Sequence, residues 1–405
     1  MRVLYALDSY RPSIDGVGVS VERQAQGLAG RGHAVAIVAP GDRLADYEET
    51  EGAVTVFRAR ALKILMDRWR VAVTPHQSVD RAITSFAPNV VVVSLPLNLN
   101  RAASDLARKH GLPLVGITGT MPEWLLYSIG ILKPFSKFLY PRLWNLLTKY
   151  YNGCDLVVGV TPTALRYLKD HGLTRPSRVI SNGVQLDVYR PGPRDEKLAQ
   201  RLRVPDKPTV LYAGRLDAEK RMDIWVKAIP LVLRQVDAHF IIGGDGTDKT
   251  KLQDIVDQMG ASEHVTFPGF LDEDEYRSLY SLADVFAIAS PAELQSIVTL
   301  EAASCGLPIV AVNAGALPEL VQHGRNGFLF SQGDSHEMAD HIVHLLRDDV
   351  LRRRMGRESR VIACQHDLNR SVREYERVYD EVVNGRNIGL GLRWRSRQSP
   401  DRIRP

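Results

Sequence analysis

The sequence has few cysteines, and no pattern links them into a site. Cys154, Cys305 and Cys364 are its three cysteines, and no two of them form a C-x-x-C pair. A disulfide framework and a cysteine zinc site are therefore excluded, and a reducing compartment is favoured. Long apolar runs are also lacking, since none approaches the roughly 18 residues that cross a bilayer. The start of the chain meets a carboxylate at Asp8, too early for a signal peptide, so we expect a cytoplasmic protein.

The composition excludes several classes of protein. With 44% hydrophobic and 24% charged residues, the chain is not disordered, collagen-like or a coiled coil. Its 405 residues predict two to three domains. Lys and Arg exceed Asp and Glu by 8 in residues 1–190, whereas the acids are in excess by 8 in residues 191–385. Two interpretations stay open: scatter between two domains, or a first half that faces an anionic partner such as a membrane surface or a charged acceptor.

Apolar runs of strand length alternate with helical patterns in the first half of the chain. The β-branched run at Val90–Leu95 is typical of a strand that is buried on both faces. This alternation predicts a parallel, doubly wound sheet. Strands are predicted at Val3–Leu7, Ala34–Ala39, Val90–Leu95, Leu114–Ile117 and Leu156–Val160, and a helix at Val19–Ala29.

The same alternation restarts in the second half, after turn-forming residues between Asn182 and Pro208. Its predicted strands are Thr209–Ala213, Ala238–Ile242, Val265–Phe267, Val285–Ala289 and Pro308–Val312, with a helix at Met222–Val236. The fold class is therefore α/β, with two Rossmann-like domains in tandem. The predicted segments are domains at residues 1–185 and 186–366, a polar helix at 367–384 and a loose basic tail at 385–405.

The segment after the first strand is a candidate site, because ligands of open parallel sheets bind beyond the carboxyl ends of the strands. Gly16 and Gly18 lie in a turn that leads into a helix, whose free N–H groups favour an anion. The third glycine of a dinucleotide fingerprint would fall on Val21, so that motif fails and a nicotinamide dehydrogenase is disfavoured. A tight turn without a ligand is the alternative.

Two later segments are also rich in candidate residues. Arg215 and Lys220 follow a predicted strand and suit a diphosphate, although a solvated charged turn would look the same. In the second segment Ser296 can cap an apolar helix, which leaves the N–H groups of Ile297 and Val298 free for a phosphate.

Two carboxylates frame this predicted phosphate site. Glu293 precedes the helix, and Glu301 lies one turn beyond its start. Acids would repel a phosphate, so their presence makes sense if each accepts hydrogen bonds from neutral sugar hydroxyls on either side of a diphosphate.

Together these segments resemble the motifs of the retaining family 4 glycosyltransferases with the GT-B fold. Glu293 and Glu301 match the E-x7-E element of that family, and 214–220 is similar to its G-R-L-x-x-E-K phosphate loop. Further matches, in family order, are Ser181-Asn182-Gly183-Val184 with an interdomain N-G-V turn, Gly269-Phe270 with a base-side loop, and Asn326-Gly327-Phe328-Leu329 with a late N-G-x-L.

The resemblance implies two Rossmann-like domains that face a cleft, with the C-terminal helix returning to the N-terminal domain. It also implies metal-independent transfer of a hexose from UDP-hexose or GDP-hexose, with no further cofactor. Glu293 is the implied catalytic residue and holds the transferred sugar. The implied donor-binding residues are Gly16, Gly214, Arg215, Lys220, Gly269, Phe270, Ile297, Val298 and Glu301. Asp272-Glu273-Asp274 is interpreted as a helix start and not as a metal site.

The acceptor half departs from the family pattern. Thr120 takes the position of a histidine that lines the acceptor side in relatives, and Glu123 follows it; both are predicted acceptor-side residues. The stretch Trp124–Tyr151 has eight aromatic residues, four cations and no acid, which suits a membrane interface. Packing of its apolar residues into the domain core is the alternative.

We therefore expect a glycosyltransferase whose acceptor is a membrane lipid or glycolipid. Its expected location is cytoplasmic, with peripheral contact at the inner face of the membrane, and nucleic acid is not an expected partner. Two other functions stay open: a nucleotide-sugar epimerase or hydrolase of the same architecture, and a non-catalytic nucleotide-sugar-binding partner.

Overall fold

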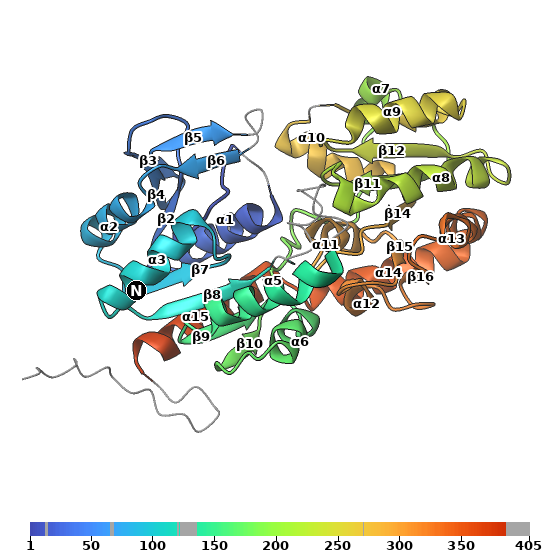
Figure 1. Cartoon of the computed structure of the whole chain (residues 1–405). Coiled ribbons are helices and arrows are strands. Elements are labelled where there is room, and N and C mark those ends of the chain that lie inside the picture. The colour runs from blue at the N-terminus through green and yellow to red at the C-terminus, as the bar shows by residue number, and fades with distance from the viewer. Residues whose placement is uncertain (13–14, 65–68, 120, 122–135, 270, 386–405) are drawn as a thin grey trace, which may run out of the picture. The chain divides into compact units, whose positions relative to one another are not determined.

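The chain forms two compact α/β units in the computed structural model (Figure 1). The structure describes all residues except 13–14, 65–68, 120, 122–135, 270 and 386–405. Unit 1 comprises the described residues of Met1–Gly119, Pro141–Ile180 and the chain from Ser371 on. Unit 2 comprises Ser181–Arg370 with the described residues of Thr120–Tyr140.

The sheet of unit 1 runs in the order β10-β9-β8-β7-β1-β2-β4-β3. Its strands pair in parallel except for β3, which is antiparallel to β4. A separate antiparallel pair joins β5 to β6. The strands are β1 (Arg2–Ala6), β2 (Ala34–Pro40), β3 (Tyr47–Glu51), β4 (Val54–Ala59), β5 (Ala61–Ile64), β6 (Trp69–Ala72), β7 (Val90–Val93), β8 (Leu114–Thr118), β9 (Leu156–Gly159) and β10 (Ser177–Val179).

The helices of unit 1 include the C-terminal helix of the described chain. Tyr375 and Tyr379 of that helix are fully buried, and the Tyr379 hydroxyl lies 3.1 Å from the hydroxyl of Tyr5 on β1. The helix therefore packs on the sheet of the N-terminal unit. The helices are α1 (Gly16–Ala29), α2 (Pro75–Phe86), α3 (Asn98–Lys109), α5 (Ser136–Tyr151), α6 (Pro162–Asp170) and α15 (Leu368–Val383).

Unit 2 has an all-parallel sheet in the order β13-β12-β11-β14-β15-β16. These strands are β11 (Thr209–Ala213), β12 (His239–Gly243), β13 (Val265–Thr266), β14 (Val285–Ile288), β15 (Ile309–Val312) and β16 (Gly327–Phe330). The helices are α7 (Glu196–Leu202), α8 (Met222–Leu233), α9 (Lys249–Gln258), α10 (Glu273–Ser278), α11 (Ile297–Ser304), α12 (Leu317–Leu320), α13 (Ser335–Arg347) and α14 (Asp349–Cys364), and short 3-10 turns are η2 (Ala218–Lys220), η3 (Ser262–His264) and η4 (Leu279–Leu282).

The strands predicted from apolar runs are confirmed, with ends that shift by at most two residues. The central ones are buried along their whole length, as in β7 and β11, because helices cover both faces of such sheets. Two helix ends differ more. The helix predicted at Val19–Ala29 begins earlier, at Gly16, where Asp15 caps it, and the one predicted to reach Val236 ends at Leu233.

Candidate functional site

The loops that follow β11, β12 and β14 lie at one edge of the unit 2 sheet. Because these strands are parallel neighbours, their carboxyl ends meet there, which is where ligands of such sheets bind. Gly214 follows β11, and its N–H donates to the Gly243 carbonyl at 2.9 Å. At Gly244, φ is +144° and a Cβ would lie 1.8 Å from the Gly214 carbonyl oxygen. Only glycine at 244 allows the two loops to approach this closely.

Arg215 is held in place by the loop that carries it. Its guanidinium donates to Asp217 at 2.6 Å and to Glu219, and its carbonyl accepts a hydrogen bond from the Tyr212 hydroxyl at 2.8 Å. Asp217 is itself fixed by the N–H and hydroxyl of Thr247, at 2.9 and 3.0 Å. The Arg215 side chain keeps 36% of its surface exposed. The loop thus presents a pre-oriented cation at the strand edge.

Lys220 and Glu293 form the ion pair that joins the two predicted segments. Lys220 ends η2 after β11, and its Nζ lies 2.7 Å from Glu293 Oε1. The two side chains are 18% and 12% exposed. The backbone carbonyl of Glu293 also accepts a hydrogen bond from the N–H of Ala316, at 2.8 Å. A partly desolvated cation and a carboxylate therefore stand side by side at the same edge of the sheet.

The first turn of α11 offers free backbone donors. The predicted cap is confirmed, since Ser296 Oγ accepts from the N–H of Thr299 at 3.3 Å. The N–H groups of Ile297 and Val298 have no acceptor among the residues that the structure describes. Both residues are half-buried. The positive end of the helix dipole and two unsatisfied N–H groups make this turn a suitable place for an anion.

Glu301 lies further along α11 and is only 2% exposed. Its Oε2 accepts a hydrogen bond from the Tyr280 hydroxyl at 2.8 Å. Burial raises the pKa of Tyr280 well above its usual value, and the Glu301 carboxylate adds to this effect. Tyr280 therefore remains a hydrogen-bond donor that orients this carboxylate.

The remaining predicted donor residues lie elsewhere in the chain. Gly269 follows β13 with φ at +73°, and nothing lies within 4 Å of where its Cβ would be. Phe270 lies outside the described residues. Gly16 belongs to unit 1, where it is exposed at the start of α1. Asp272 and Glu275 form a capping box at the start of α10, which confirms the interpretation of this acidic run as a helix start.

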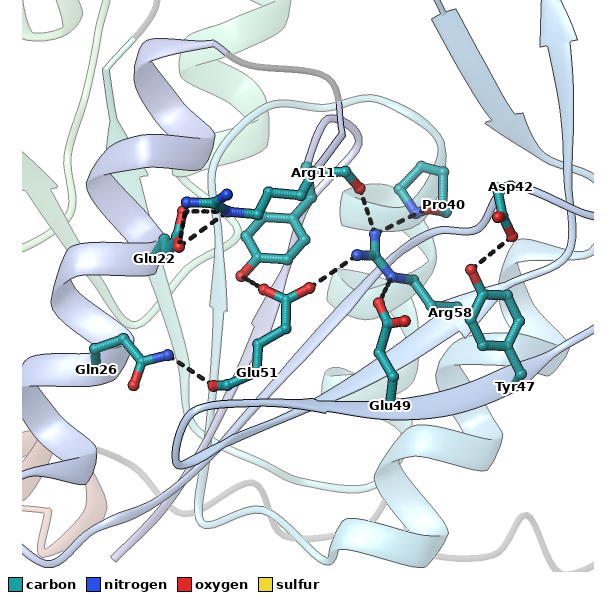
Figure 2. Close-up of polar contacts among 10 residues, drawn as sticks. Arg11, Glu22, Gln26, Pro40, Asp42, Tyr47, Glu49, Glu51 and Arg58 are labelled. Carbon is teal, nitrogen blue, oxygen red and sulfur yellow. Dashed lines mark hydrogen bonds and ion pairs between the residues drawn. The ribbon is translucent and has the colours of Figure 1, made fainter. Parts of the chain in front are cut away.

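A buried arginine fixes the segment that precedes Gly16 (Figure 2). The Arg58 side chain on β4 is 6% exposed and pairs with Glu49 and with Glu51, the latter at 3.0 Å. Its Nη1 also donates to the backbone carbonyl of Arg11, at 2.8 Å. The two β3 carboxylates balance the buried charge, and the guanidinium holds the loop between β1 and α1.

The structure describes only part of the segment predicted to lie on the acceptor side. Thr120 and Glu123 lie outside the described residues, as does Trp124, the first residue of the aromatic stretch. Within α5, Trp144 and Tyr151 are 0% and 1% exposed. These two rings pack in the core, as the alternative interpretation expected, and are not available to a membrane. None of the helices in the described parts of the chain has the length and apolarity that a membrane span requires.

Several neighbours of the candidate site were not predicted from the sequence. Asp217, Glu219 and Gln295 were not among the predicted site residues, and neither was Tyr280. Its spacing from Glu301 carries no local signal, because the fold alone brings the two residues together.

Both halves of the chain match models of known glycosyltransferase families. A family model described as "Glycosyltransferase Family 4" matches residues 14–188, and one described as "Glycosyl transferases group 1" matches residues 193–361. Among solved structures, the sucrose-phosphate synthase of Thermosynechococcus elongatus superposes with a TM-score of 0.77 at 17% identity, over 95% of this chain and 99% of that one. The structure of Anabaena HepE in complex with UDP-glucose superposes with a TM-score of 0.73 at 22% identity, over 94% of this chain and 100% of that one. At such identities these structures establish the fold alone.

Curated relatives include enzymes named for lipid acceptors. The chain is 33% identical over 220 residues to the GDP-mannose-dependent alpha-(1-6)-phosphatidylinositol monomannoside mannosyltransferase of Mycobacterium tuberculosis. That match covers 52% of this chain and 57% of the relative, so the similarity spans little more than half of either protein. The alpha-monoglucosyldiacylglycerol synthase of Acholeplasma laidlawii is 22% identical over 400 residues, which is 96% of this chain and 99% of that one.

Proposed function

The chain belongs to the glycosyltransferases of family 4 with the GT-B fold, and we propose that it transfers a hexose from a nucleotide diphosphate sugar to a lipid hydroxyl, with retention of configuration. The observation that carries this proposal is the Lys220–Glu293 pair, in which Glu293 stands shortly before the free first turn of α11 in the sequence. This arrangement combines a phosphate-binding end with a carboxylate that can bind hydroxyls. A nucleotide sugar has the same two parts.

In this proposal the donor diphosphate is bound by groups of unit 2. Arg215 and Lys220 neutralise its charge, and the N–H groups of Ile297 and Val298 donate to its oxygens. The main demand of the reaction is stabilisation of the charge that develops on the departing diphosphate, and pre-oriented donors meet this demand well. Arg215 supports this role because two carboxylates already fix its guanidinium.

The two glutamates take the neutral parts of the donor. Glu293 accepts hydrogen bonds from hydroxyls of the transferred hexose, and Lys220 orients this carboxylate. Glu301, which receives a hydrogen bond from Tyr280, accepts from the ribose. Gly214, Gly269 and Phe270 complete the donor side, and Gly16 is a further proposed donor-binding residue.

No metal is assigned to the diphosphate in this proposal. Arg215, Lys220 and the α11 N–H groups supply the positive charge that a divalent cation supplies in other transferases. Within the described residues, no three His, Cys, Asp or Glu side chains are grouped so that they could hold a metal ion.

The acceptor is proposed to be a hydroxyl of a membrane lipid or glycolipid, at the inner membrane face. Two relatives named for phosphatidylinositol monomannoside and monoglucosyldiacylglycerol support this class. Thr120 and Glu123 are the proposed acceptor-side residues. The domain at 1–185 would receive the acceptor, and the domain at 186–366 would hold the donor. Since Trp144 and Tyr151 are buried, contact with the membrane would fall to other residues of the stretch 124–151.

The test is to incubate the purified protein with UDP-, GDP- and ADP-hexoses, with and without phospholipid vesicles that contain phosphatidylinositol or diacylglycerol. We expect release of one nucleotide that requires vesicles, with the sugar recovered on lipid in the anomeric configuration of the donor. Release without any acceptor would instead support an epimerase or hydrolase. Binding of a nucleotide sugar without release, against lipid and glycan acceptors alike, would support a non-catalytic partner.

A further inference from the structure

We propose that Gln295 is a positioning residue that couples the donor-binding loop to the segment through which the chain enters unit 2. This inference rests on the function proposed above, because its readout is turnover of a nucleotide sugar. Gln295 stands two residues after Glu293 and directly before Ser296, the cap of α11. Gln295 therefore stands between the sugar-binding carboxylate and the phosphate-binding turn.

Both the oxygen and the nitrogen of the Gln295 amide are hydrogen-bonded, and the residue is only 8% exposed. Its Oε1 accepts the backbone N–H of Asn182 at 2.6 Å, and its Nε2 donates to Ser181 Oγ at 3.0 Å. Both partners lie more than 110 residues earlier in the chain, at separations of 113 and 114. Buried side-chain amides are costly to leave unpaired, so these hydrogen bonds fix the loop to this one segment.

That segment is one of the places where the chain passes between the units. Ile180 is the last residue of its stretch in unit 1, and Ser181 is the first of the next stretch in unit 2. The chain returns to unit 1 between Arg370 and Ser371. Gln295 thus holds the first two residues after a crossing point.

The returning segment is bound to the same place. The N–H of Val184 donates to the His366 carbonyl at 2.8 Å, and the N–H of Leu368 donates to the Val184 carbonyl at 3.0 Å. A Cβ at Gly183, where φ is +79°, would lie 2.6 Å from Leu368 Cα, so the two backbones are in close contact. His366 Nδ1 also lies 3.0 Å from Ser181 Oγ. The segment just before the passage at Arg370 therefore contacts the same Ser181 hydroxyl that Gln295 contacts.

This arrangement gives Gln295 a role that simple loop support would not have. Two-domain transferases close around their substrates before the chemical step, and closure must change backbone angles near the crossings. Through Ser181 and Asn182 that change is transmitted to Glu293 and to the first turn of α11. In the proposed function the nucleoside diphosphate is bound mainly by Arg215, Lys220 and the first turn of α11, whereas the link joins Gln295 to Ser181 and Asn182. Loss of the link should therefore change the nucleotide Kd little and turnover more.

The experiment compares Gln295→Leu, Ser181→Ala and the double variant with Gln258→Leu, which changes an exposed glutamine on α9 of the same unit. It measures kcat for release of nucleotide from the accepted donor, and the Kd of the nucleoside diphosphate by calorimetry. We expect Gln295→Leu to lower kcat about tenfold with the Kd unchanged. Ser181→Ala should act in the same direction, and the double variant should be no worse than Gln295→Leu, because both changes remove one link.

Several results would overturn the inference. A folded Gln295→Leu variant with the kcat of Gln258→Leu would do so, as would a Kd that weakens in parallel with kcat, or single effects that multiply in the double variant. If Gln295→Leu does not fold, Ser181→Ala alone decides, with Ser181→Thr expected to restore kcat by returning the hydroxyl. A wild-type protein that turns over no nucleotide sugar would refute the proposed function and this inference with it, whereas the variant results refute the inference alone.

Discussion

Lys220 Nζ lies 2.7 Å from Glu293 Oε1, although 73 residues separate the two in the sequence. The pair forms because each residue follows a strand, and those strands, β11 and β14, are parallel neighbours in the sheet. In the proposed reaction the lysine turns to the diphosphate and the glutamate to the hexose. The ion pair therefore holds the group that would bind the diphosphate next to the group that would bind the hexose before any substrate is present.

Replacement of Glu293 by glutamine should cut transfer by about a hundredfold, on the scale of losing one pre-oriented polar contact to the reacting group. The amide keeps the shape and can still accept from Lys220, so the melting temperature should change little. Steady-state release of nucleotide and thermal denaturation measure the two effects. Near-normal turnover in this variant would remove Glu293 from the site.

Replacement of Arg215 by alanine should weaken nucleoside diphosphate binding roughly tenfold to a hundredfold, the range for a hydrogen bond to a charged group. The loss is enhanced because Asp217 and Glu219 would then face the phosphates without their guanidinium. Calorimetric titration gives the Kd, with Arg353→Ala as the control for an exposed arginine on α14. Equal affinities in the two variants would contradict the role of Arg215.

Removal of divalent cations should leave donor turnover unchanged. The proposed diphosphate site already contains Arg215, Lys220 and two free N–H groups of α11. Turnover is measured after dialysis against EDTA, and again after addition of Mg²⁺ or Mn²⁺. Activity that EDTA abolishes and a metal restores would show that these groups are not sufficient.

The stability of the protein should fall as the pH is lowered from about 6.5 to 4. Burial lowers the pKa of His239 from 6.5 to about 4, with the nearby charge of His264 adding to the effect. As the pH falls, this histidine is therefore protonated first in the unfolded chain. The free energy of unfolding is highest above pH 6.5 and decreases as the pH approaches the His239 pKa of the folded protein. The expected decrease is about 3 kcal/mol at pH 4. Urea unfolding of wild type and His239→Gln across this range tests it, and equal pH slopes would contradict it.

The strands could be predicted because the sheets are buried on both faces. Runs such as Val90–Val93 and Thr209–Ala213 are wholly buried, and this environment leaves a direct apolar signature in the sequence. The edge of unit 1 has no such signature. Tyr47–Glu51 is an acidic strand whose residues alternate between half-buried and exposed, and it pairs antiparallel to β4. The predicted parallel, doubly wound sheet therefore carries one antiparallel edge strand that the sequence did not indicate.

Arg58 explains why β4 was also missed. An arginine in a short apolar run argues against a buried strand, yet Glu49 and Glu51 of the adjacent strand neutralise it. Such compensation is visible only once the strands are paired.

The candidate site follows the same division. Ser296 as a helix cap could be predicted from local chemistry, since a serine before an apolar helix has few other roles. Two sets of contacts could not be predicted in this way: that of Tyr280 with Glu301, and those of Ser181 and Asn182 with Gln295. They are distant in the sequence, and only the packing of unit 2 brings them into contact.

The most direct test of the account is a crystal structure of the protein with the nucleoside diphosphate that it binds most tightly. We predict that the diphosphate oxygens lie within hydrogen-bonding distance of Arg215, Lys220 and the backbone N–H groups of Ile297 and Val298, with the ribose hydroxyls on Glu301. A nucleotide bound away from the carboxyl ends of β11 and β14, or one whose phosphates leave the first turn of α11 empty, would contradict the account.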